Sequence, residues 1–155
     1  MSDTKLTPEQ NFQKGVELAQ IGTEQLQEEK INECIENTLN AIQYFTQSHT
    51  QLMVGKAFRQ LAEAYQAQQN WVGCLASYQE SINWDLKVGK LQGVVITQLH
   101  VFELLLQLAQ LDKAQTCLTE AKNNLEQYRD EIPKYQEFAD YITDREQKLA
   151  MLKSN

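Results

Sequence analysis

Residues 58–81 read FRQLAEAYQAQQNWVGCLASYQES, two runs of helix-forming residues joined by the polar turn Gln69-Asn70. Apolar and small residues recur in each run at intervals of three and four, the spacing of one face of an α-helix. The same pattern returns 40 residues earlier and 40 residues later, as three equivalent sets: Ile31, Trp71 and Leu111; Cys34, Cys74 and Ala114; Ala41, Ser81 and Ala121. A fixed period of this size is typical of stacked helical repeats, so the sequence predicts an all-α protein.

Seven helices are predicted when the pattern is followed along the chain. The first begins after Thr7, because Thr7 can cap a helix, Pro8 suits the first helical position and Gln10 completes a capping box. Gly89 is a plausible C-terminal stop for the fourth helix, and Pro133 separates the last two helices. The later six helices are expected over residues 31–48, 52–68, 71–86, 91–110, 112–129 and 134–152.

Composition limits the classes of protein to which the chain can belong. It has 155 residues, of which 42% are hydrophobic and 23% charged, and we expect a single domain over residues 1–155. The net charge of −7 argues against nucleic acid as a partner, because phosphate binding requires clustered Lys and Arg. The most apolar stretch, residues 94–111, contains His100 and Glu103, so it predicts a buried helix and no membrane insertion. Three cysteines without a secretory signal favour free thiols and a cytoplasmic location.

The repeat pattern resembles the tetratricopeptide repeat, or TPR, a family of two-helix units. The middle copy matches best, with Phe58, Leu61, Ala62 and Tyr65 on its first helix and Cys74, Tyr78 and Ser81 on its second. The family period is about 34 residues, so each copy here is elongated. The resemblance implies a right-handed superhelical stack of three repeats over residues 12–48, 52–88 and 92–129, with residues 134–152 as a C-terminal capping helix. The third copy departs from the pattern, because Phe102 stands where the family has a small residue.

The resemblance also implies a concave groove lined by the first helix of each repeat, in which a partner peptide or helix would bind. The residues expected to face it are Val16, Ala19, Thr23, Leu26, Lys56, Arg59, Gln60, Glu63, Gln66, Ile96, Leu99, Glu103 and Leu106. In the alternative interpretation, Ile96, Leu99 and Leu106 are core residues packed under the seventh helix. The clamp with which some family members hold a C-terminal carboxylate is not expected, since Ala19 and Thr23 occupy its positions.

No catalytic or metal-binding set is apparent in the sequence. Cys34 and Cys74 occupy equivalent repeat positions and are expected to be small, buried and inert, without a metal or cofactor. His100 lacks a neighbouring nucleophile and orienting group for general-base chemistry. We therefore expect a non-enzymatic adaptor or scaffold that binds another protein. The alternatives are a structural module that self-associates into a homo-oligomer and a peptide-sensing regulator that acts in trans.

Overall fold

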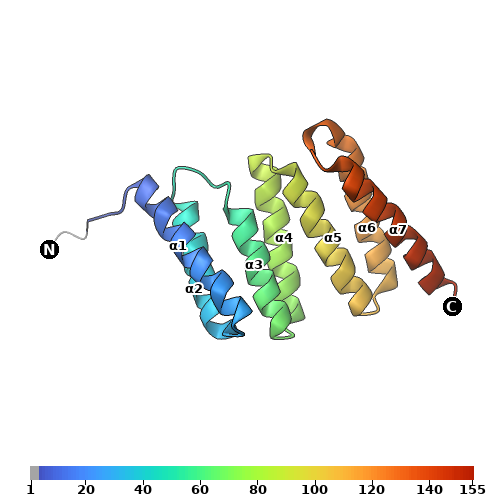
Figure 1. Cartoon of the computed structure of the whole chain (residues 1–155), viewed down its shortest axis with the longest axis horizontal. Coiled ribbons are helices and arrows are strands. Elements are labelled where there is room, and N and C mark those ends of the chain that lie inside the picture. Colours follow the sequence, from blue (N-terminus) through green and yellow to red (C-terminus); the bar gives the residue numbers. More distant parts are fainter. Residues whose placement is uncertain (1–3) are drawn as a thin grey trace. The chain divides into compact units, whose positions relative to one another are not determined.

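The computed structural model describes residues 4–155 and contains seven α-helices and one short 3-10 helix in this part of the chain, without β-strands (Figure 1). The helices are α1 (Pro8–Gln27), α2 (Ile31–Thr46), α3 (Val54–Ala67), α4 (Trp71–Val88), α5 (Leu91–Gln107), α6 (Leu111–Gln127) and α7 (Tyr135–Lys153), with η1 (Arg129–Glu131) before the last. The predicted all-α fold class is therefore confirmed. None of these helices is both long and apolar enough to cross a membrane.

Local sequence signals set the ends of α1 and α4 as predicted. The Thr7 hydroxyl accepts a hydrogen bond from the backbone N–H of Gln10 at 3.1 Å, and the Gln10 side chain accepts one from the Thr7 N–H at 2.8 Å. This reciprocal capping box satisfies two of the donors that a helix N-terminus leaves unpaired. At the end of α4, Gly89 has a φ of 76°, a left-handed conformation that glycine adopts without the steric cost of a Cβ atom.

The three turns inside the helical hairpins repeat the 40-residue period in the backbone. Glu29, Gln69 and Ala109 all adopt the left-handed conformation, with φ values of 61°, 58° and 57°. In each turn the backbone N–H of the residue that follows donates a hydrogen bond to a carbonyl in the last turn of the preceding helix. The Lys30 N–H, for example, donates to the Gln25 carbonyl at 2.8 Å. Non-glycine residues accept this conformation at a cost of roughly 1–2 kcal/mol, which the capping hydrogen bonds of the closed turn offset in part. The three connections therefore have one shared geometry.

The chain divides into two compact units at the boundary between Val88 and Gly89. In the first unit, α1 pairs with α2, α3 pairs with α4, and α2 also packs against α3. The apolar core of this unit is centred on Phe45, which is fully buried and lies against Phe12 with ring centroids 5.9 Å apart. Six buried residues form this core: Ala41, Ile42, Phe45, Val54, Ala57 and Leu61.

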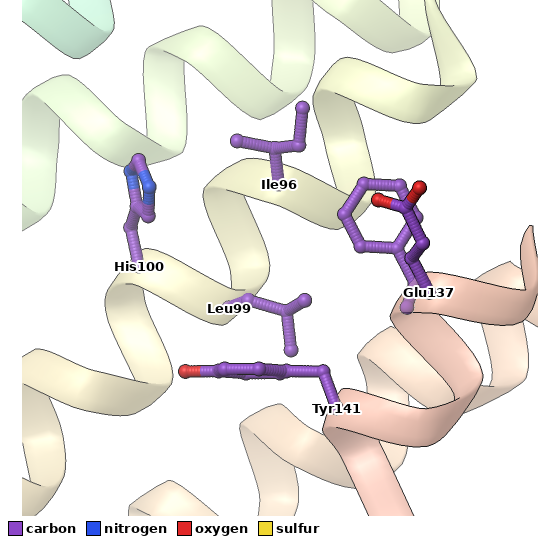
Figure 2. A pocket seen from close by; sticks show the side chains of 6 residues that line it. Ile96, Leu99, His100, Glu137 and Tyr141 are labelled. Atoms are coloured by element: carbon purple, nitrogen blue, oxygen red, sulfur yellow. The ribbon is translucent and has the colours of Figure 1, made fainter. Parts of the chain in front are cut away.

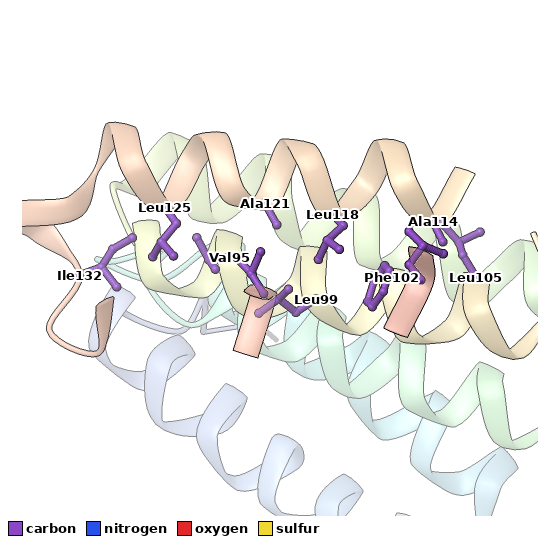
Figure 3. Close-up of a cluster of buried hydrophobic side chains, with 11 residues drawn as sticks. Val95, Leu99, Phe102, Leu105, Ala114, Leu118, Ala121, Leu125 and Ile132 are labelled. Atoms are coloured by element: carbon purple, nitrogen blue, oxygen red, sulfur yellow. The ribbon is translucent and has the colours of Figure 1, made fainter. Parts of the chain in front are cut away.

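The second unit contains the α5–α6 hairpin and α7, which packs on α6. Its core lies between α5 and α6 (Figure 3). Two fully buried side chains of α7, Ile142 and Leu149, also belong to this core. Leu152, near the end of α7, is 43% exposed. The other core residues are Val95, Leu99, Phe102, Leu105, Ala114, Leu118, Ala121, Leu125 and Ile132.

One register position differs strongly among the three hairpins. Gly22 in α1, Ala62 in α3 and Phe102 in α5 stand 40 residues apart. All three are buried, yet Gly22 has no side chain, Ala62 has a methyl group and Phe102 has a benzyl group. A Cβ atom on Gly22 would lie 2.4 Å from the Gln60 Nε2 atom, so the first position has no room for one. The ring of Phe102, in contrast, is part of the core between α5 and α6, so the third hairpin is built around a larger residue.

Candidate functional site

A groove of about 370 Å³ opens between α1 and α3 in the first unit. It is lined by Val16, Ala19, Gln20, Thr23, Glu24, Phe45, Met53, Lys56 and Ala57, and we refer to it as the α1/α3 groove. Its base is apolar, because Phe45 and Ala57 belong to the core, and its rim carries the exposed Gln20, Glu24 and Lys56. The structure therefore brings together four residues that the sequence assigns to a groove: Val16, Ala19, Thr23 and Lys56.

Arg59, predicted to contact a partner, is instead bound inside the protein. Its Nη1 atom lies 2.6 Å from Oδ2 of Asp85 in α4 and donates a hydrogen bond to the Ser81 hydroxyl at 3.2 Å. The Asp85 side chain is fully buried, and that of Arg59 is 14% exposed. The carboxylate fits against the backbone at Gly55, where an added Cβ atom would lie 2.1 Å from Oδ1. Arg59 therefore neutralises a buried charge and holds α3 to α4.

Gln60 also has a role inside the first unit. Its Nε2 atom donates to the Thr38 hydroxyl of α2 at 2.7 Å and to the Ala19 carbonyl of α1 at 3.2 Å. Its Oε1 atom accepts a hydrogen bond from the Thr23 hydroxyl at 2.7 Å. This amide thus links three helices behind the α1/α3 groove, in the space that Gly22 leaves open.

Three further predicted site residues of the first unit lie outside the groove lining. Leu26 and Gln66 are half-buried, whereas Glu63 is exposed on α3 one turn from Arg59. Partial burial of the Glu63 carboxyl raises its pKa, and the positive charge of Arg59 acts in the opposite direction. None of these three residues lines the α1/α3 groove.

The second unit has a hollow of its own, of about 360 Å³, between α5 and α7. Ile96, Leu99 and His100 come from α5, and Glu137, Phe138 and Tyr141 come from α7 (Figure 2). We refer to it as the α5/α7 pocket. In Figure 2 the Tyr141 ring lies beneath Leu99, and His100 and Glu137 stand on opposite sides of the pocket. Of the residues assigned to a groove by sequence, Ile96 and Leu99 line this pocket.

Glu103, the next predicted residue on α5, is engaged by α7. The Tyr141 hydroxyl donates a hydrogen bond to its carboxylate, and the Arg145 Nε atom lies 3.0 Å from Oε1. The Arg145 guanidinium also stacks over the Tyr141 ring at 4.8 Å. Burial, together with the hydrogen bond to Glu103, raises the pKa of Tyr141 to about 12. The hydroxyl therefore keeps its proton at neutral pH and donates a hydrogen bond. Glu103 thus fastens α7 to α5.

Leu99 and Leu106 fit the alternative interpretation of core residues packed under the seventh helix. Leu99 is 6% exposed and belongs to the core of the second unit, against which the half-buried Leu106 packs. Leu99 therefore forms the base of the α5/α7 pocket, and Leu106 lies outside its lining.

Two of the three cysteines are fully buried, and Cys117 is half-buried. Cys34 and Cys74 are fully buried, as expected from their repeat positions, and burial raises the pKa of Cys74 to about 11. Cys117 donates to the Gln98 carbonyl at 3.1 Å, and burial raises its pKa to about 12. The thiolate is the nucleophilic form, so a raised pKa lowers the reactivity of these thiols at neutral pH. Within residues 4–155, no group of three or more His, Cys, Asp or Glu residues is arranged to hold a metal ion.

Comparison of the chain with protein-family models, with curated proteins and with solved structures found no significant match.

Proposed function

We propose that this chain is a non-enzymatic, TPR-like adaptor that binds a segment of another protein in the α1/α3 groove. The observation that carries the proposal is the position of this groove between the first helices of two successive hairpins. That is where the resemblance to the tetratricopeptide repeat puts the peptide-binding surface. Four of the residues expected there from the sequence line it.

The lining favours an amphipathic helix or an extended segment with an acidic residue. Val16, Ala19 and Met53 offer apolar surface for one or two anchor side chains of the partner. Lys56 is the exposed cation of the groove lining, since Arg59 is committed to Asp85. A carboxylate of the partner beside Lys56 would orient the segment and speed its association. Glu24, on the α1 side of the rim, would disfavour a second acidic group at that end.

The groove is tested by affinity capture from native extract, with the chain carrying Ala19→Arg and Lys56→Glu as bait. The arginine fills apolar space and the glutamate reverses the rim charge, so we expect partner recovery to fall about tenfold or more. Both sites are on the surface of the groove, and the variant is expected to remain folded. Lys148→Glu is the control for the charge reversal, because it makes the same substitution as Lys56→Glu at an exposed position of α7. Equal recovery of one partner by all three folded baits would rule out the groove.

A further inference from the structure

The α5/α7 pocket differs in chemistry from the α1/α3 groove. We infer that it receives one large apolar side chain from a basic amphipathic helix of a partner protein, with a Lys or Arg of that helix beside Glu137. The inference rests on the proposed role as a protein-binding module and adds a second contact site with its own partner chemistry. Its residues are all in the second unit, so it shares no residue with the α1/α3 groove.

The walls of the pocket account for the apolar anchor. Ile96 and Phe138 are half-buried, and Leu99 at the base is almost wholly buried. The Tyr141 ring forms one wall and is held in place by the bond from its hydroxyl to Glu103 and by the stacked Arg145. A preformed wall of this kind loses little side-chain entropy on binding, and aromatic residues around a pocket are common binding hot spots. A Leu or Phe side chain on a docked helix fits within this hollow of about 360 Å³.

The rim of the pocket accounts for the basic character of the partner. Glu137, Asp140 and Asp144 are exposed and stand three and four residues apart, so they form one stripe along α7 beside the Phe138 and Tyr141 side chains. Gln136 donates to Asp140 at 2.8 Å, and Asp144 lies 4.0 Å from Arg145, so two of the three carboxylates have a neighbouring group that orients them.

The cations near the pocket leave this negative stripe exposed. Arg145 is paired with Glu103, and Lys134 and Lys148 lie beyond the two ends of the stripe. His100 stands on the opposite wall from Glu137 (Figure 2). An acidic segment would therefore be repelled along the middle of α7, whereas a helix with Lys or Arg one turn from its apolar anchor would be attracted.

The probe for this site is a synthetic helical peptide with Leu and Phe on one face and Lys on the other. Two peptides serve as comparisons: one with Glu in place of every Lys, and one of the same composition as the probe in scrambled, non-amphipathic order. Binding is followed by fluorescence anisotropy with the intact chain, and the contact site by NMR shifts of the Ile96 and Leu99 methyl groups. The variant Glu137→Lys is compared with Glu120→Lys, which makes the same charge change at an exposed position of α6.

We expect the basic amphipathic peptide to bind, to shift both methyl resonances, and to lose about fivefold in affinity with Glu137→Lys while Glu120→Lys changes it less than twofold. Equal binding of the acidic or scrambled peptide, equal loss with both variants, or methyl shifts confined to the first unit would each overturn the inference. Failure here would leave the α1/α3 groove intact, because that groove is tested separately by Ala19→Arg and Lys56→Glu. Negative results in both tests would contradict the proposed protein-binding function.

Discussion

Replacing Arg59 with methionine is expected to lower the free energy of unfolding of the first unit by about 3–5 kcal/mol. The substitution keeps the long apolar stem but leaves the Asp85 carboxylate, which is fully buried, without its cation. Desolvation of an unpaired charge makes the loss of one partner much costlier than the net contribution of the pair. Unfolding in urea can be followed by tryptophan fluorescence, because both tryptophans of the chain, Trp71 and Trp84, lie in α4, and Trp84 directly precedes Asp85.

The double variant Arg59→Met, Asp85→Leu is the control for this prediction. It removes both charges and keeps a branched side chain against Gly55, so it should recover most of the lost stability. If the single variant loses less than about 1 kcal/mol, or the double variant is no more stable than the single, the buried pair does not hold α3 to α4. The prediction also explains why Arg59→Glu is unsuitable for testing partner binding, since it would place a second negative charge beside Asp85.

Phe102→Ala is expected to destabilise the second unit by about 3–5 kcal/mol. The ring is fully buried between α5 and α6, and its removal leaves a cavity that two packed helices close only in part. Far-UV circular dichroism during denaturation, with hydrogen exchange of the α6 amides, measures the loss in this unit.

Two variants act as controls for Phe102→Ala. Phe102→Leu should cost much less, about 1.5 kcal/mol, because it retains most of the volume. Ala62→Phe, the reciprocal change in the second hairpin, should destabilise the first unit by about 1–3 kcal/mol through overpacking. Tolerance of Phe102→Ala would mean that the third hairpin accepts the small residue that the family pattern has at this position.

The sequence was sufficient for the helices and for part of the first groove. Apolar spacing predicted seven helices, and the capping box at Thr7 and the stop at Gly89 were read correctly from local chemistry. The resemblance to the tetratricopeptide repeat assigned Val16, Ala19, Thr23 and Lys56 to a groove, and all four line the α1/α3 groove. The left-handed turns at Glu29, Gln69 and Ala109 carry no glycine, so the usual sequence signal for this geometry was missing.

Periodicity alone could not predict which candidate site residues are bound to other residues within the protein. Arg59 and Asp85 lie 26 positions apart on different helices, and their pairing depends on the rotation of α3 against α4. An Asp in register with Tyr78 and Ser81, on the buried face of α4, was the available signal. The α5/α7 pocket was harder to predict, because α7 lies beyond the three repeats that the sequence pattern defined. Glu137, Phe138 and Tyr141 line this pocket because α7 docks beside α5, and that position is known only from the structure.

The most direct measurement of the central claim is photo-crosslinking in living cells with a photoreactive amino acid at Gln20, on the rim of the α1/α3 groove. Gln43, which is exposed on α2 and outside the groove lining, is the matched control position. The proposed function predicts a discrete adduct with a partner protein from position 20 and none from position 43. An adduct from position 43 alone, the same adduct from both positions, or no adduct from position 20 would contradict it.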